Sequence, residues 1–176
     1  MGDVDTSLSN GETAVLYIAQ GISVDVTSTD NSLRGGGSRS FIIINEGTLN
    51  YVGDVTLGAG IVINNCATGT LNADDMGISN AGVVNNLGTI NFTGGLTNNN
   101  DAGGIYNEGT FNVDGTFTNN GVVCGPDVGC GVFSVGGSSS NPTGSFGADA
   151  GGVDGGNVDI CDVGNDGFSP NNGTTG

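Results

Sequence analysis

Short apolar runs separated by Gly and Asn form the main pattern along this chain. Many of the runs are only three or four residues long and rich in β-branched side chains, as in FIII at 41–44 and IVI at 61–63. Runs of this length are typical of β-strands, whereas helices need longer periodic segments. The 36 Gly residues also disfavour helices, because each interior Gly costs a helix about 1 kcal/mol. The pattern therefore predicts an all-β fold.

A Gly-Thr-apolar-Asn motif recurs at a nearly constant interval. Its copies are INEGTLN at 44–50, NCATGTLN at 65–72, NNLGTIN at 85–91 and YNEGTFN at 106–112. Each copy is followed by two further strand-like runs, and Gly, Asn and Asp between them tolerate tight corners. Repeats near 20 residues with short strands are typical of solenoids. We therefore predict a parallel β-helix (a β-solenoid) of roughly triangular section, with about 20 residues per coil and about 4.8 Å between coils.

The repeats divide the chain into three segments. Residues 41–133 hold the regular coils. Residues 1–40 contain an alternating stretch at 14–30 and a Gly-rich loop, so we expect irregular β coils there. Residues 134–176 are rich in Gly, Ser and Asp and poor in apolar residues, as expected of a tail or an assembly segment.

Alternation along each strand predicts three columns of inward-facing apolar residues. The first column comprises Leu49, Leu71, Ile90 and Phe111; the second comprises Leu57, Ile78, Leu96 and Phe117; the third comprises Ile61, Val83, Ile105 and Val122. The Thr of each Gly-Thr then points outward.

Two sets of Asn residues flank the repeated Gly-Thr pairs. Asn45, Asn65, Asn86 and Asn107 are expected near one corner, and Asn50, Asn72, Asn91 and Asn112 at the next. Stacked amides can hydrogen-bond from coil to coil, as in cross-β ladders, and can satisfy backbone groups at a bend. We therefore predict two structural Asn ladders.

The charge balance narrows the possible partners. The chain has 18 acidic residues and two Arg, with no Lys or His, for a formal charge of −16. This charge repels phosphate backbones and anionic membranes, so nucleic-acid partners are not expected. No apolar run approaches the roughly 20 residues needed to span a bilayer, so membrane insertion is not expected either.

Four Cys residues favour an oxidising location. Cys124 and Cys130 bracket a short turn and could close a small disulfide loop, whereas zinc is disfavoured because there is no His and no C-x-x-C pair. Cys66 and Cys161 could pair through a folded-back tail, cross-link two chains or stay as buried thiols. Together with the sequons at Asn91 and Asn172, this composition indicates an extracellular or cell-surface protein.

The sequence contains few of the residues that usually carry out catalysis. Without His or Lys, nucleophilic catalysis lacks its usual base. Asp54, Asp74, Asp75 and Asp114 follow the Asn corner at similar coil positions and could form the carboxylate cluster of a polysaccharide-degrading enzyme. Such a stripe is more often a solvated corner. Ice binding would need a repeated Thr-x-Thr array, which the coils do not carry. We expect no catalytic residues and no enzyme.

Calcium is the one cofactor that the sequence brings into consideration. Asp162, Asp166 and Gly167 partly match a calcium loop, and Asp154 and Asp159 could add oxygen ligands. Gly173 stands where an EF-hand carries an acidic residue, so a standard EF-hand is excluded. A polar turn is the alternative.

The coils between Phe41 and Val123 resemble the parallel β-helix repeats of filamentous-haemagglutinin-like adhesins and autotransporter passengers, which also contain Asn-x-Gly-Thr-apolar-Asn. The resemblance implies extracellular adhesion or scaffolding. A solenoid also has two open ends, and head-to-tail contact between such ends builds fibres. We therefore expect a non-enzymatic extracellular structural protein that self-assembles into a surface filament. The alternative is a calcium-dependent adhesin or glycan-binding module.

Overall fold

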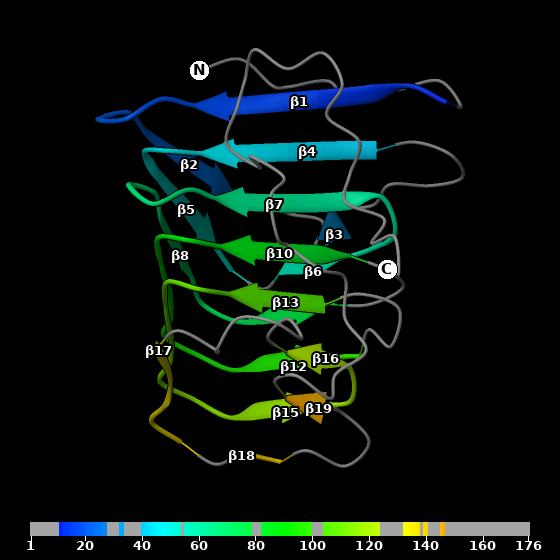
Figure 1. Ribbon diagram of the computed structural model, residues 1–176, viewed down its shortest axis with the longest axis vertical. Helices are drawn as coiled ribbons and strands as arrows, with labels where there is room; N and C mark the ends of the chain where they lie inside the picture. Colours follow the sequence, from blue (N-terminus) through cyan, green and yellow to red (C-terminus); the bar gives the residue numbers. More distant parts are fainter. Residues whose placement is uncertain are drawn as a thin grey trace.

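The computed structural model describes residues 11–27, 32–33, 40–53, 55–78, 82–99, 104–123, 132–137, 139–140 and 145–146. All regular secondary structure in these residues is β-strand. Figure 1 shows the strands stacked above one another along the long axis, with β1 at one end and β18 at the other. The all-β prediction is confirmed.

The strands form three parallel sheets. Sheet A has the order β1 (Thr13–Ile18), β4 (Ser40–Asn45), β7 (Ile61–Asn65), β10 (Val83–Asn86), β13 (Gly104–Asn107), β16 (Val122–Val123) and β19 (Ser145–Phe146). Sheet B has the order β2 (Ser23–Thr27), β5 (Thr48–Val52), β8 (Thr70–Ala73), β11 (Thr89–Phe92), β14 (Thr110–Val113) and β17 (Val132–Val135). Sheet C has the order β3 (Ser32–Leu33), β6 (Val55–Leu57), β9 (Met76–Ile78), β12 (Leu96–Asn98), β15 (Phe117–Asn119) and β18 (Ser139–Ser140).

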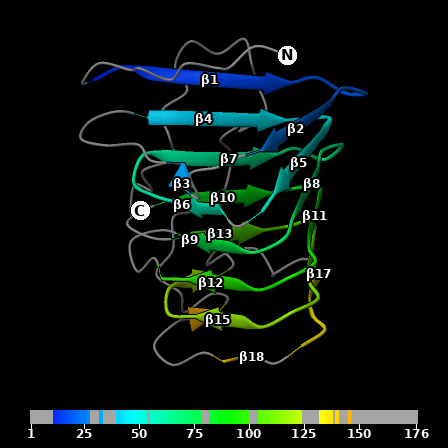
Figure 2. The same ribbon diagram turned by 180° about the vertical axis from the view of Figure 1, so that it is seen from behind.

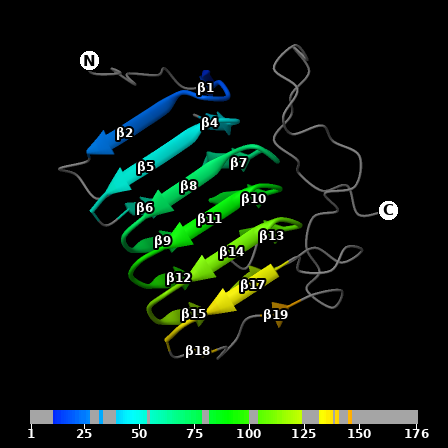
Figure 3. The same ribbon diagram turned by 90° about the vertical axis from the view of Figure 1, so that its left-hand side faces the viewer.

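Each coil takes one strand from each sheet in sequence order. The chain passes from β4 to β5 to β6 and returns to sheet A as β7, directly beside β4. Figure 3 shows the strands of sheet B side by side, and Figure 2, which is seen from behind, shows the strands of sheet C stacked one above another. Paired residues in sheet B are 19 to 25 positions apart, as in Val24–Leu49 and Leu71–Ile90. The predicted β-solenoid is confirmed.

The coil that precedes the regular repeats is in register with them. β1 pairs with β4 over its whole length, and β2 pairs with β5 so that Val24 lies beside Leu49. The irregular coils expected in residues 1–40 therefore include strands that extend all three sheets. Beyond residue 133, β18 and β19 extend sheets C and A.

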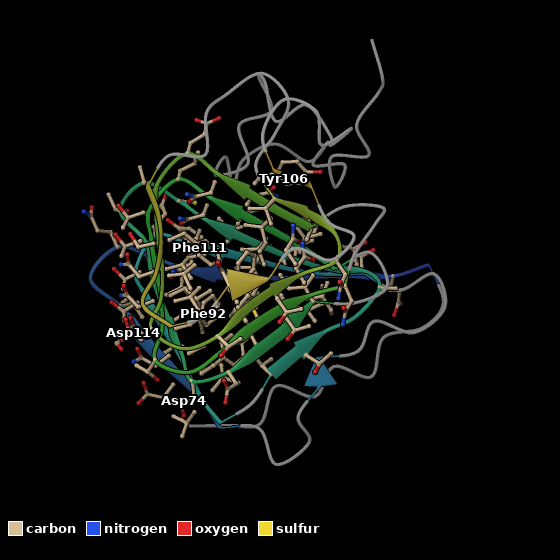
Figure 4. All side chains as sticks on the ribbon, turned by 90° about the horizontal axis from the view of Figure 1, so that it is seen from below. Asp74, Phe92, Tyr106, Phe111 and Asp114 are labelled. Carbon is tan, nitrogen blue, oxygen red and sulfur yellow. The ribbon has the colours of Figure 1, made fainter. Side chains whose placement is uncertain are left out.

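The first predicted apolar column runs through the centre of the solenoid. Leu49, Leu71, Ile90 and Phe111 are paired from strand to strand, and each is fully buried. The ring centroids of Phe92 and Phe111 lie 5.5 Å apart in successive coils. Figure 4 shows both rings inside the coil, whereas Asp74 and Asp114 lie at its outer rim. Burial of this column removes apolar side chains from water and so contributes to the stacking of the coils.

The second predicted column is wrong in register. Leu57 pairs with Ile78, but Leu96 pairs with Met76 and then with Phe117. Sheet C therefore has two inward columns, and the partners of Ile78 in later coils are Asn98 and Asn119. Both Asn residues are buried, and Nδ2 of Asn98 donates to Oδ1 of Asn119 at 2.9 Å. An inward position can therefore be polar where a second amide completes the hydrogen bond.

The third predicted column is also wrong in register. In sheet A the inward column comprises Ile43, Ile63, Val84, Ile105 and Val123. Of the predicted members, Ile105 belongs to this column, and Ile61 is buried in the same core but pairs with Phe41. In contrast, Val83 pairs with Val62 and Val122 with Gly104. The error arises because adjacent residues in these strands are both apolar, so alternation does not distinguish the two faces.

A substitution in the first column tests the stacked core directly. Replacing Ile90 by Ala opens a cavity between Leu71 and Phe111, and a buried Ile-to-Ala change costs about 2–5 kcal/mol. Replacing its neighbour Thr89, which is half-buried on the outer face, serves as the control and should cost under about 1 kcal/mol. Urea unfolding followed by circular dichroism measures both. Equal losses would contradict the inward position of Ile90.

Candidate functional site: the asparagine ladders and the coil ends

A buried Asn ladder marks the corner between sheets A and B. Asn45, Asn65, Asn86 and Asn107 are at most 1% exposed. Nδ2 of each of the first three donates to Oδ1 of the next, at 2.7, 2.8 and 2.7 Å. The sequence predicted this ladder, and the structure brings all four residues together at the end of their strands.

The second proton of each amide fixes the direction of the buried ladder. Nδ2 of Asn45, Asn65 and Asn86 also donates to the backbone oxygen of Thr70, Thr89 and Thr110, in each case at 3.0 Å. Only the amide nitrogen of an Asn side chain can donate to a carbonyl oxygen, so the Oδ1 atom of each Asn must face the preceding coil. Each amide thereby joins its own coil to the next coil through two hydrogen bonds.

The Gly of each Gly-Thr pair allows the coils to approach at this corner. A Cβ atom on Gly88 would collide with the carbonyl oxygens of Cys66 and Gly69, and one on Gly109 would collide with that of Gly88. The amide nitrogen after each Gly donates to the coil before, as Thr89 does to Gly69 at 3.0 Å. The repeated motif therefore reflects a steric requirement of stacking.

The second predicted ladder exists, but it does not lie at a corner. Asn50, Asn72, Asn91 and Asn112 lie inside strands of sheet B, on the outer face. Nδ2 of Asn72, Asn91 and Asn112 donates to Oδ1 of the preceding member at 2.9 Å each. The corner assignment was wrong because the strands extend past the Asn before the chain turns. Nδ2 of Asn50 continues the ladder to Oδ1 of Asp25 at 2.7 Å.

Three further amide pairs were missed from the sequence. They are Asn64 with Asn85, Asn98 with Asn119, and Asn99 with Asn120, joined by hydrogen bonds of 2.8, 2.9 and 2.8 Å. Each pair is separated by 21 residues, so aligning all Asn residues on the coil length would have found them. Amide pairing therefore occurs in every sheet.

Two of the carboxylates considered as a possible catalytic cluster, Asp74 and Asp75, accept hydrogen bonds from backbone amides and a hydroxyl group. Oδ2 of Asp74 accepts from the amide of Gly53 at 3.2 Å, and Oδ1 accepts from the Thr93 hydroxyl at 3.0 Å. Oδ1 of Asp75 accepts from the amide of Gly95. In the described part of the chain, no three His, Cys, Asp or Glu side chains are close enough to share a metal ion.

Several predicted site residues lie outside the described residues. They are Asp54, the calcium candidates Asp154, Asp159, Asp162 and Asp166, and the cysteines Cys124 and Cys130. The calcium site and the Cys124–Cys130 disulfide therefore stay predictions. No helix long and apolar enough to cross a membrane occurs in the described segments.

The N-terminal end of the solenoid exposes apolar side chains. Val15 and Ile22 are each 53% exposed, and Tyr17 is 42% exposed. The Tyr17 hydroxyl donates to Oε2 of Glu46 in the next coil. This hydrogen bond is the main cause that raises the pKa of Tyr17 above its usual value. In contrast, Tyr51 is buried inside the coil, and burial raises the pKa of its phenol.

Comparison with known protein families, with characterised proteins and with solved structures finds no match to this chain. The structure therefore shows a parallel β-solenoid, and no comparison identifies a family for its repeats. The features of this chain that bear on its function are the Asn ladders and the two ends of the stack.

Removing one amide from the buried ladder should destabilise the fold strongly. Asn86→Ala deletes the acceptor for Asn65 and the donor to both Asn107 and the Thr110 carbonyl. Each unsatisfied buried polar group costs about 1–3 kcal/mol, so we expect a total loss of roughly 2–5 kcal/mol.

The matched control is Asn91→Ala on the outer ladder, where water can replace the lost partners. We expect a loss of about 1 kcal/mol or less. Both values come from urea unfolding monitored by circular dichroism. A larger loss for Asn91→Ala than for Asn86→Ala would show that the buried ladder is not the stabilising one.

The two perturbed tyrosines predict a loss of stability in alkali. An unfolded phenol ionises near pH 10, whereas folding raises the pKa of Tyr17 and Tyr51. The stabilisation is therefore complete below pH 10 and is lost as the pH rises through the folded pKa values. Phenolate absorbance should show ionisation above the usual range, and Tyr51→Phe should remove the last step. Ionisation of all three tyrosines together near pH 10 would contradict this.

Proposed function

We propose that this protein is a non-enzymatic structural subunit that self-assembles by head-to-tail stacking of β-solenoids into an extracellular filament. The observation that carries the proposal is the parallel stack itself, in which every coil pairs with the next through all three sheets. A second copy added at either end would continue the same pairing. Such a contact is heterologous and therefore propagates without closing.

The two ends present complementary strand edges. β1, β2 and β3 are the first strands of their sheets, and β19, β17 and β18 are the last. Exposed edges pair readily with other chains unless they are blocked. The exposed Val15, Ile22 and Tyr17 add apolar surface to the N-terminal coil. This surface supports a contact with another protein molecule.

The outer ladder of sheet B indicates how the two ends could match. At one end it finishes at the carboxylate of Asp25, and at the other Asn112 pairs with the exposed Ser134. If β17 of one copy pairs with β2 of the next, a Ser134 hydroxyl meets an Asp25 carboxylate. A hydroxyl that donates to a carboxylate forms a charge-assisted hydrogen bond. The ladder would then continue across the junction.

Net charge opposes this association. Each copy carries a formal charge of −16, so neighbouring copies repel one another. Salt screens the repulsion between exposed charges, because the Debye length falls from about 30 Å at 0.01 M to about 10 Å at 0.1 M. Assembly should therefore increase with ionic strength, which suits a protein that works outside the cell.

The second candidate function is an adhesin or glycan-binding module, with or without calcium. The outer face of sheet B favours it, because Thr48, Thr70, Thr89 and Thr110 alternate with the Asn ladder over four consecutive coils. This surface is polar, uncharged and regularly spaced. Its Asn amides already bond to one another, however, so fewer polar groups remain for a ligand.

The filament proposal is tested at the Ser134 position. Ser134→Glu places a second carboxylate against Asp25, and we expect shorter filaments in negative-stain micrographs and slower pelleting at 0.15 M salt. Ser134→Asn supplies an amide donor, and we expect filaments of at least wild-type length. The control Thr89→Glu adds the same charge in the middle of the stack and should leave filament length unchanged.

Wild-type protein that stays monomeric at high concentration and in 0.5 M salt, by sedimentation velocity, would overturn the proposal. Binding of that monomer to a glycan array would favour the adhesin. If chelator abolished the binding, the calcium-dependent form would be supported.

A further inference from the structure

The outer face of sheet B carries a regular array of uncharged polar side chains. In β5, β8, β11 and β14 the outward positions hold a Thr and, two residues later, an Asn, and all of these side chains are partly exposed. In Figure 3 this face points toward the viewer, with its strands side by side. Equivalent residues repeat about every 4.8 Å from coil to coil. The face therefore presents two straight columns, one of hydroxyls and one of amides.

The amide column has unused hydrogen-bond donors. Nδ2 of Asn72, Asn91 and Asn112 each donates one proton to Oδ1 of the preceding coil, and its second proton has no acceptor among the described residues. The two N–H bonds of an amide diverge, so a proton that follows the stack leaves the other pointing away from the sheet. In the buried ladder, by contrast, Nδ2 of Asn65 and Asn86 uses both protons. The outer ladder can therefore donate to a second molecule.

The described acidic residues lie mostly beside this face and not on it. Glu46 and Glu108 follow strands of sheet A, whereas Asp74 and Asp114 follow strands of sheet B. Asp25, in β2, is the one acidic residue among the described positions of the face itself. Copies of a chain with a formal charge of −16 repel one another. From β5 to β14, two copies can therefore meet on this face without bringing carboxylates together on it.

The other two outer faces suit such a contact less well. In sheet C each of β6, β9, β12 and β15 has only its middle residue on the outside, so that face is one residue wide. In sheet A the outward residues Ile42, Ile44 and Val62 are already buried in the single chain. The outer face of sheet B is therefore the widest exposed polar surface along the described stack.

A second copy that runs in the opposite direction matches this face. Each Oδ1 of the outer ladder accepts from the following coil, so all the amide dipoles of one copy point the same way. Two such columns attract side by side when they run antiparallel, because unlike partial charges then lie opposite each other. The antiparallel arrangement pairs Asn72 with Asn91, Asn50 with Asn112, and Asp25 with the exposed Ser134.

We propose that the outer faces of sheet B in two antiparallel copies pack against each other and join two filaments side by side. The contact is isologous, because both copies use the same surface, and it therefore closes into a pair. The hydroxyl columns face each other and so do the amide columns. The outward amide protons of each copy donate to side-chain oxygens of the other copy. This contact rests on the filament proposed above and adds a lateral partner to it.

The size of the face explains why the pairing needs a filament. The six strands of sheet B span about 24 Å along the stack, and the two columns cover about 10 Å along the strands. Roughly 240 Å² of each copy is then covered, far less than the roughly 800 Å² per partner of a stable interface. A filament repeats the face in every subunit, so many small contacts act together. Filaments therefore pair, whereas single copies do not.

The first test measures the mass per unit length of filaments by scanning transmission electron microscopy. Wild-type filaments should contain two chains per subunit repeat along the axis. Thr110→Glu buries a carboxylate against Thr48 of the other copy without a partner, and we expect the mass per unit length to fall twofold. The control Thr97→Glu adds the same charge to the outer face of sheet C and should keep the wild-type value.

A second variant tests the antiparallel register. Thr48→Lys combined with Thr110→Glu places a cation opposite each new carboxylate of the other copy and should restore the wild-type mass per unit length. Within one copy, residues 48 and 110 are three coils apart, or about 14 Å, which exceeds the Debye length of about 8 Å at 0.15 M salt. The two charges therefore do not neutralise each other inside one copy. One chain per repeat in this double variant would overturn the antiparallel contact.

Failure of this contact is distinguishable from failure of the filament. Wild-type filaments with one chain per subunit repeat would overturn the lateral contact and leave head-to-tail stacking in place. Double filaments that Thr110→Glu does not separate would show that another surface joins them, which also overturns the contact. Protein that forms no filaments would overturn both proposals.

Discussion

Parallel pairing between segments about twenty residues apart is the constraint on which this fold depends. Each strand bonds to the equivalent strand of the coils before and after it, so all three sheets must keep the same register at once. A coil of variable length is possible only because its corners absorb the difference, as in the 19- and 22-residue spacings beside Leu71. Inward apolar columns and outward polar ladders are two consequences of that register.

The Asn side chains supply hydrogen-bond donors for backbone groups at the corners. Where the chain turns between sheets A and B, backbone carbonyls leave the ladder of strand hydrogen bonds and would be buried without donors. The Asn ladder supplies those donors and binds its own members in the same step. The ladder begins imperfectly, because Asn45 faces Ile18 and its Oδ1 has no partner. The first coil is therefore bonded less completely than the coils that follow it.

The sequence predicted the architecture where one face of a strand is exposed to solvent. In such strands apolar and polar residues alternate with the two-residue period of a strand, so the inward face can be identified. In sheet B, alternation places Ile90 inward and Thr89 outward, and both assignments are correct. In sheet A, alternation failed at Val83 and Val84 because the neighbouring strands bury apolar residues on both faces. In sheet C it failed because a buried amide, Asn98, occupies an inward position. These errors arise from burial on both faces of a strand and from side-chain pairing between coils, neither of which is visible in a single strand.

The same features bear on function. The continuous pairing of the described strands in all three sheets is the feature that supports the proposed head-to-tail assembly. The carboxylates of Asp74 and Asp75 are engaged by backbone and hydroxyl groups, which is a structural use.

The central claim is that equivalent residues of successive coils lie directly above one another. Nuclear Overhauser effects between methyl groups of selectively labelled protein measure this most directly. The account predicts strong contacts from the Leu71 methyls to those of both Leu49 and Ile90, which are 22 and 19 residues away. Contacts from Leu71 to neither residue would contradict the stacked-coil structure.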